Sequence, residues 1–204
     1  MGLIAADLFL TLDGVYQAPG GPDEDREGGF AFGGWQAPYA DAAIGALIRS
    51  SIERTDALLL GRRTYDIFAA YWPFQSAAEP IAAKFAAIPK YVVSRTLEHP
   101  SWAGTTVLRD AAAVGRLRDE FDEVHTWGSG ELLRSLLAVG LLDRLNLWIY
   151  PLALATGKRL FETGTVPLAF RPVQPAFVSD SGVMALVYEP AGDVETGDVG
   201  AADA

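Results

Sequence analysis

The sequence has no cysteine, only two histidines, and no long apolar run free of charge. Without cysteine there are no disulfides, thiol nucleophiles or thiolate metal ligands, and a cytoplasmic protein is predicted. No stretch approaches the roughly 18 uncharged apolar residues of a membrane span, so we predict no membrane segment. Residues 1–7 lack the basic start of a signal peptide and reach an acid at Asp7, so we expect them to begin a strand.

Basic residues are also scarce, since 16 lysines and arginines stand against 26 acids and the formal net charge is −10. This balance argues against nucleic acid or an anionic membrane as a partner, although a few arginines could still hold a small phosphorylated ligand. His99 and His125 have no acid at metal-ligand spacing, so we expect neither a metal site nor a Ser-His-Asp triad. We predict His125 to be a buried, hydrogen-bonded core residue.

Strand-like and helix-like patterns alternate along most of the chain, and a hairpin pattern around Asp180-Ser181-Gly182 closes it. This order predicts an α/β protein with three layers, α/β/α, whose mixed, mostly parallel sheet ends in a C-terminal antiparallel hairpin. The chain of 204 residues suits one domain, which we assign to residues 1–190. Residues 191–204 are small and acidic, and we predict a disordered tail.

The expected strands cover residues 3–12, 57–60, 90–95, 105–108, 124–127, 141–150, 176–179 and 183–188. The expected helices cover residues 41–54, 62–71, 79–87, 110–121 and 130–140. Between residues 20 and 35 we expect a long loop whose acidic run, Asp23 to Glu27, is a solvated tip. The aromatic residues in and after this loop need cover, and they either pack on the core or form a wall over a ligand.

Three of the expected strands end in polar turns that continue into a helix or a loop. The carboxyl ends of parallel strands meet at one edge of a sheet, where ligands of such folds bind. Helix N-termini and arginine side chains both bind phosphate, so these turns predict a site for NADPH with its pyrophosphate and 2′-phosphate. The expected cofactor contacts at the turns are Gly61, Arg62, Arg63, Thr64, Ser94, Arg95, Gly128, Ser129 and Gly130.

The glycine turn is a weak signal when it is taken alone. The dinucleotide-binding fingerprint has a third glycine three residues after the second, and Leu133 occupies that position here. The turn is not a nucleophile elbow either, because that motif needs glycines two residues on either side of the serine.

The chain resembles the dihydrofolate reductase superfamily, and within it the C-terminal reductase domain of the bifunctional riboflavin-biosynthesis deaminase-reductase. The matching segments, in family order, are Ile4 to Ala6, Thr11 to Gly14, Leu60 to Tyr65, Val93 to Arg95, Trp127 to Leu132, and Gly157 to Phe161. The resemblance implies an NADPH-dependent reductase, active either on a phosphoribosylaminouracil-like substrate or on a folate-like one. It adds Ala5, Ala6, Glu131 and Leu132 to the expected cofactor contacts, and it implies a homodimer.

The resemblance breaks at the substrate acid of dihydrofolate reductases, which lies on the helix before the Gly-Arg turn. That position falls near Gly45 here, and the nearest acid is Asp41. Asp13, Asp41 or water could supply the proton, although Asp13 could also simply cap its turn. We expect the substrate to lie against Gly14, Trp35 and Tyr39.

Two functions remain open at this point. One is an NADPH-dependent reductase that transfers hydride to a C=N or C=O bond of a small pteridine- or pyrimidine-like substrate. The other is a non-catalytic nucleotide-binding or sensor protein of the same fold.

Overall fold

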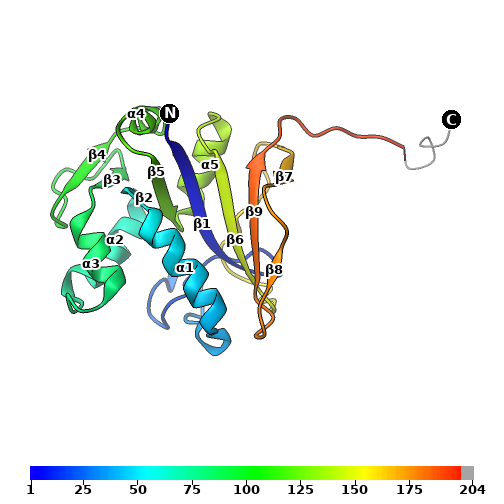
Figure 1. The fold of residues 1–204 in the computed structure, drawn as a ribbon, viewed down its shortest axis with the longest axis horizontal. Helices are drawn as coiled ribbons and strands as arrows, with labels where there is room; N and C mark the ends of the chain where they lie inside the picture. Colours follow the sequence, from blue (N-terminus) through cyan, green and yellow to red (C-terminus); the bar gives the residue numbers. More distant parts are fainter. Residues whose placement is uncertain (199–204) are drawn as a thin grey trace.

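A computed structural model describes residues 1–198 and contains one nine-stranded sheet (Figure 1). Its strands lie in the order β4-β3-β2-β5-β1-β6-β9-β7, and β8 also pairs with β9. The strands are β1 (Leu3–Thr11), β2 (Ala57–Gly61), β3 (Lys90–Val93), β4 (Thr105–Leu108), β5 (Glu123–Trp127), β6 (Arg144–Tyr150), β7 (Phe170–Pro172), β8 (Phe177–Val178) and β9 (Met184–Pro190).

The strands from β4 to β6 are all parallel, whereas β9 pairs antiparallel with β6, β7 and β8. The predicted mostly parallel sheet with an antiparallel C-terminal edge is therefore confirmed. The sequence analysis missed β7, which pairs Phe170 with Pro190 and Pro172 with Tyr188. A three-residue edge strand containing proline carries too little alternation to be recognised.

The helices are α1 (Ala42–Arg54), α2 (Arg62–Tyr71), α3 (Pro80–Ala87), α4 (Leu117–Glu120) and α5 (Gly130–Ala138). Short 3₁₀ turns lie at η1 (Glu27–Gly29), η2 (Ala37–Tyr39), η3 (Trp72–Phe74) and η4 (Ala112–Arg116). The helix expected over residues 110–121 is thus η4 followed by the single turn of α4. Asp110 precedes this segment, and its Oδ1 accepts a hydrogen bond from Ala113 N at 2.8 Å.

The helices cover both faces of the sheet, as the alternating side chains of β2 show. Leu58 and Leu60 pack with residues of α1, α2 and α3, whereas Leu59 packs with Leu133 and Leu136 of α5. Figure 1 accordingly shows α1 in front of the sheet and α5 behind it. The three-layer prediction is confirmed, and we refer below to the α1 face and the α5 face.

Residues 191–198 form neither helix nor strand and lead away from the sheet (Figure 1). Their first residues are tied to the strand-β7 region, since Ala191 N donates to Ala169 O at 2.8 Å. Residues 199–204 of the predicted tail lie outside the described residues. Within residues 1–198, every helix is too short or too polar to cross a membrane.

Candidate functional site

Two of the predicted turns form one structural unit at the carboxyl edge of the sheet. β2 ends at Gly61, which is the N-cap residue of α2, and β5 ends at Trp127, two residues before Ser129, the N-cap residue of α5. Gly61 N donates to Ser129 Oγ at 2.8 Å, so the amino termini of α2 and α5 lie side by side. Neither terminus is capped by the side chain of its N-cap residue. The first N–H groups of two helices, with their partial positive charge, therefore lie at this edge.

The glycines of this unit have different roles. Gly128 has a φ of +78°, and a Cβ atom added to it would meet only Thr64, at ordinary contact distance. Gly61 and Gly130 instead make room for protein groups, because a Cβ atom would lie 3.1 Å from Ser129 Cβ and 2.4 Å from Tyr16 Cζ, respectively. Only the approach to Gly128, beside the Thr64 hydroxyl, leaves the backbone open to an anion.

Arg62 and the loop after β3 lie at one side of the paired helix termini. Arg62 Nε lies 2.9 Å from both carboxylate oxygens of Asp66, and its Nη1 lies 3.5 Å from Thr96 Oγ1. Ser94 Oγ accepts hydrogen bonds from the backbone N–H groups of Thr96 and Leu97, so it shapes this loop. The structure brings Arg62 to the loop that carries Arg95.

The side chain of Arg95 is exposed, and within residues 1–198 it has no hydrogen-bond or ion-pair partner. Arg109, which follows β4, holds the loop in place. Its Nη1 donates to the carbonyl oxygens of Ser94, Arg95 and Leu97 at 3.0–3.3 Å. The sequence analysis missed this positioning role, because a single arginine after a strand carries no pattern.

Arg63 points to the opposite side, toward the long loop. It forms ion pairs with Asp25 at 2.6 Å and Glu27 at 3.2 Å, and Lys158 contacts the same two carboxylates. The pKa of Asp25 is lowered, because the Lys158 hydrogen bond and the nearby cations outweigh the opposing effect of burial. The pKa of Glu27 is also lowered, chiefly by its hydrogen bond from Lys158. The prediction of a solvated tip is wrong for Asp25, which is buried.

The remaining cofactor candidates offer little side-chain surface. Ala5 and Ala6 are fully buried within β1, and Leu132 packs in the core on the α5 face. Glu131 is exposed in the first turn of α5. Any contact of Ala5, Ala6 or Leu132 with a cofactor would therefore be made through the backbone.

Both predicted acids accept hydrogen bonds from backbone N–H groups. Asp13 accepts hydrogen bonds from Thr11 Oγ1 at 2.6 Å, from the N–H groups of Leu154 and Ala155, and from Arg159 Nη2. Although desolvation opposes the shift, these donors hold the pKa of Asp13 well below its usual range.

Asp41 caps α1 by accepting from the N–H groups of Ala43 and Ile44, and it also accepts from Ser181 N at 3.2 Å. The backbone N–H of Ile44 is the main cause of its lowered pKa. Asp41 is thus the N-cap residue of α1.

The predicted substrate residues lie near the carboxyl ends of β1 and β6. Gly14, with a φ of +79°, turns the chain after β1. Trp35 is buried, its indole Nε1 donates to Gln17 O at 2.8 Å, and its ring lies 5.2 Å from that of Tyr150. The ring of Tyr39 lies 5.9 Å from the same tyrosine. Both residues pack on the α1 face.

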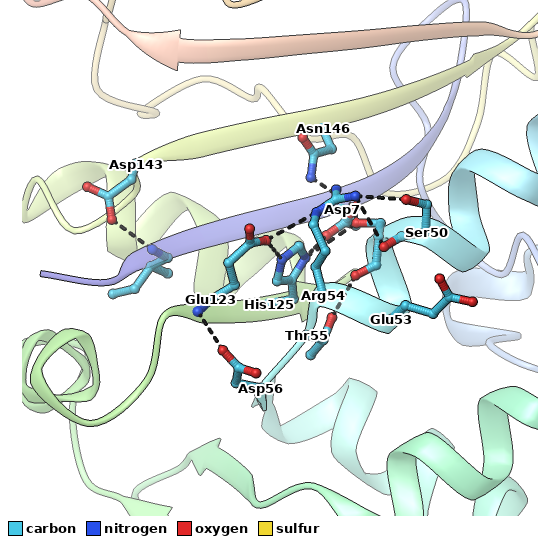
Figure 2. Close-up of polar contacts among 12 residues, drawn as sticks. Asp7, Ser50, Glu53, Arg54, Thr55, Asp56, Glu123, His125, Asp143 and Asn146 are labelled. Atoms are coloured by element: carbon cyan, nitrogen blue, oxygen red, sulfur yellow. Dashed lines mark hydrogen bonds and ion pairs between the residues drawn. The ribbon is translucent and has the colours of Figure 1, made fainter.

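A buried polar network on this face was not foreseen. Asp7 of β1, which is fully buried, accepts from Ser51 Oγ at 2.8 Å and from Asn146 Nδ2 at 3.0 Å. His125 Nδ1 lies 2.6 Å from the other Asp7 oxygen, and His125 Nε2 lies 2.9 Å from Glu123 (Figure 2). The prediction that His125 is a hydrogen-bonded core residue is confirmed. Its partner Asp7 was visible only as an acid within an apolar strand.

The fold is an α/β fold of the dihydrofolate reductase-like class. The chain belongs to the RibD C-terminal domain family, whose model matches residues 3–176. This membership supports a reductase role and implies a small-molecule substrate.

The chain is also similar to individual proteins over most of its length. The chain is 24% identical over 193 residues to the uncharacterized protein YyaP of Bacillus subtilis (strain 168), covering 91% of this chain and 93% of YyaP. A putative riboflavin biosynthesis protein from Shewanella sp. PV-4 has a similar structure, with a TM-score of 0.64, 18% identity, and coverage of 93% of this chain and 99% of that one. For a pyrimidine reductase-like protein from Corynebacterium diphtheriae the TM-score is 0.58, with 13% identity and coverage of 94% and 93%. At these identities the two structures support the fold alone.

Proposed function

We propose that the protein is an NADPH-dependent reductase that transfers hydride to a C=N or C=O bond of a small pteridine- or pyrimidine-like heterocycle. One observation carries this proposal, namely the pairing of the α2 and α5 amino termini through Gly61 N and Ser129 Oγ at 2.8 Å. Two uncapped helix termini beside an open glycine suit a pyrophosphate better than a single phosphate. Membership of a reductase family supports the same reading.

Different residues would bind different parts of NADPH. The N–H groups of α2 and α5, the Thr64 hydroxyl and the open face of Gly128 would hold the pyrophosphate. The exposed Arg95 and the nearby Arg62 would bind the 2′-phosphate, because a guanidinium matches phosphate oxygens. Bound NADPH supplies the hydride, and the protein supplies position. Arg63 would contribute less, because two carboxylates already neutralise it.

We propose water as the proton source among the three candidates. Asp13 and Asp41 are both ionised at neutral pH, as their lowered pKa values require, and both accept hydrogen bonds from backbone N–H groups. A carboxylate in this state is a poor proton donor.

The test is titration with NADPH, followed by fluorescence, together with assays of NADPH oxidation against pteridines, pyrimidines and small carbonyl compounds. The proposal expects saturable binding and oxidation with at least one compound. Binding without oxidation across the panel would favour the non-catalytic nucleotide sensor. Absence of NADPH binding would overturn both functions.

Four further parts of the proposal concern the location of the protein and its partners. We propose a cytoplasmic protein that acts on a small molecule, forms a homodimer, and has no nucleic-acid partner. The formal charge of −10 supports the last point, because phosphate backbones would be repelled. Light scattering during gel filtration measures the oligomeric state directly.

A further inference from the structure

The phenol ring of Tyr16 covers the first residue of α5. A Cβ atom added to Gly130 would lie 2.4 Å from Tyr16 Cζ and 2.7 Å from the Tyr16 hydroxyl oxygen, so only glycine leaves room for the ring. The Cα–Cβ bonds of a helix tilt toward its amino terminus. The hydroxyl of Tyr16 therefore lies beside the amino end of α5, where the proposed cofactor site begins.

The backbone of Tyr16 is held in place within the loop after β1. Its N–H donates to Lys158 O at 2.9 Å. The preceding residue, Val15, is fully buried and forms a β-bridge with Arg159. The following residue, Gln17, is also buried, and its side-chain oxygen accepts from Lys158 N at 3.1 Å. Because all three residues are tied to residues 158 and 159, the phenol is already in position before any ligand binds.

The hydroxyl of Tyr16 has a proton that is free to be donated. It has no hydrogen-bond partner among residues 1–198, and the residue is only partly buried. Burial raises the pKa of the phenol, although the nearby cations Arg134 and Lys158 act in the opposite direction. The phenol is therefore protonated at neutral pH and can donate a hydrogen bond to an anion.

The two cations near Tyr16 are already engaged by other groups. Lys158 lies 2.6–2.7 Å from two carboxylates of the long loop, and Arg134 Nη1 donates to the backbone carbonyls of residues 159 and 160. The side chain of Ser129, the N-cap residue, forms no hydrogen bond with the first N–H groups of α5. These terminal N–H groups and the Tyr16 hydroxyl therefore remain as donors for an anion.

Tyr16 and Arg95 approach the paired helix termini from opposite sides. In the sheet, β5 lies between β1 and β2, and β3 lies beyond β2. Tyr16 follows β1, whereas Arg95 follows β3, and Thr64 belongs to α2, which follows β2. A dinucleotide with its 2′-phosphate at Arg95 and its pyrophosphate at Gly128 would therefore extend toward Tyr16.

We propose that Tyr16 binds the pyrophosphate of the cofactor, donating its hydroxyl proton to a phosphate oxygen while its ring excludes water from the amino end of α5. Hydrogen bonds to charged oxygens are strong, and excluding water strengthens them further. The ligand class is a molecule that carries a pyrophosphate, with or without a 2′-phosphate. The proposal rests on the proposed reductase function, and it adds to that site a residue from the loop after β1.

The test compares two fragments of NADPH by calorimetric titration of the full chain. ADP-ribose contains the pyrophosphate but no 2′-phosphate, whereas 2′-AMP contains the 2′-phosphate but no pyrophosphate. Tyr16→Phe keeps the ring and removes only the hydroxyl. It should weaken binding of ADP-ribose about 10- to 100-fold, the loss of one hydrogen bond to a charged group, and leave binding of 2′-AMP unchanged. Arg95→Ala should show the reverse pattern.

Tyr71→Phe is the matched control, because Tyr71 ends α2, is exposed, and packs against Trp72. It should bind both fragments as the wild type does. Equal affinities of Tyr16→Phe and the wild type for ADP-ribose would overturn the proposal. So would an equal weakening of both fragments in Tyr16→Phe, or a wild type that binds 2′-AMP but not ADP-ribose.

Thermal unfolding tests the contact between the ring and the helix. Gly130→Ala should lower the melting temperature of the wild type by several degrees, because the added methyl group would overlap the phenol. In a Tyr16→Ala background the space is open, and Gly130→Ala should leave the melting temperature unchanged or raise it, since alanine favours a helix. If Gly130→Ala did not affect the wild type, the phenol would not cover this terminus and the proposal would fail.

NADPH titrations of the same proteins separate the two proposals. If NADPH binds while Tyr16→Phe has no effect on ADP-ribose, the role of Tyr16 is wrong and the cofactor site stands. If the wild type binds neither NADPH nor either fragment, the reductase proposal fails, and the role of Tyr16 fails with it.

Discussion

His125 Nδ1 lies 2.6 Å from Asp7 Oδ2, and this contact joins the two central strands β5 and β1 within the α1 face (Figure 2). The second ring nitrogen of His125 lies 2.9 Å from Glu123, which Arg54 approaches at 3.5 Å. Burial disfavours the charged imidazolium, but the carboxylates of Asp7 and Glu123 outweigh it and raise the pKa of His125 above its ordinary value. The two strands are therefore joined by a buried histidine that contacts two acids.

Stability should depend on this histidine in a pH-dependent way. A raised folded-state pKa means that the contribution of His125 is complete below about pH 6.5, the ordinary value for histidine, and is lost as the pH rises through the folded value. We expect His125→Gln to lower the free energy of unfolding by about 3–5 kcal/mol at pH 6, because the Asp7 carboxylate loses its charged partner. The difference from the wild type should shrink toward pH 9. Urea unfolding at several pH values measures it.

His99→Gln is the matched control, since His99 is exposed and is the only other histidine. Its difference from the wild type should stay near zero across the same pH range. A His125 difference that grows with pH would show that the folded-state pKa is lowered rather than raised.

The sequence could not reveal this pair. Asp7 and His125 are 118 residues apart, and each was visible only as a polar residue in an apolar strand. Local periodicity, by contrast, predicted the bounds of β1, β2, α1 and α2 to within a residue or two. The two helices each bury one stripe of side chains and the two strands bury both faces, so their patterns are visible within the segment itself. Patterns within a segment define elements, whereas a buried ion pair depends on which strands become neighbours.

The candidate cofactor site, like the fold, could be predicted from the sequence only in part. The turns after β2 and β5 could be recognised because glycine and arginine follow buried strands, and the structure brings them together. The directions of the side chains could not be recognised, so Arg62 and Arg63, adjacent in sequence, lie toward different loops.

The arginines provide a second prediction. Arg95→Ala should weaken NADPH binding about 10- to 100-fold, the effect of losing hydrogen bonds to a charged group, and should weaken NADH binding much less because NADH lacks the 2′-phosphate. Arg63→Ala should have a smaller effect, since Asp25 and Glu27 already pair with Arg63. Fluorescence titrations with both nucleotides make the comparison. Arg49→Ala, at an exposed position of α1, is the control. If Arg95→Ala weakened the binding of NADPH and NADH equally, Arg95 would not contact the 2′-phosphate.

Asp13 provides a test of its structural role. Asp13→Ala removes the acceptor for Ala155 N, Leu154 N and Arg159, so we expect a loss of about 1–3 kcal/mol in the free energy of unfolding at pH 7. Because the folded-state pKa is lowered, the stabilisation is present above the ordinary value for aspartate, near pH 3.9, and is lost as the pH falls through the folded value. Asp180→Ala, at an exposed turn, should cost little in the same denaturation experiment. If Asp13→Ala were as stable as the wild type and yet inactive, the acid would have a catalytic role.

Gly128 links the backbone of the glycine turn to cofactor binding. Its φ of +78° is strained for any residue with a branched side chain, and valine would also occupy the open approach beside Thr64. We expect Gly128→Val to abolish NADPH binding while thermal unfolding stays cooperative, with a stability loss of about 1–3 kcal/mol. Gly140→Val is the matched control, because Gly140 has a φ of +66° with no atom near its added Cβ and lies at the other end of α5. It should show a similar loss of stability and normal NADPH affinity, so retained binding in Gly128→Val would mean that the pyrophosphate does not lie at this turn.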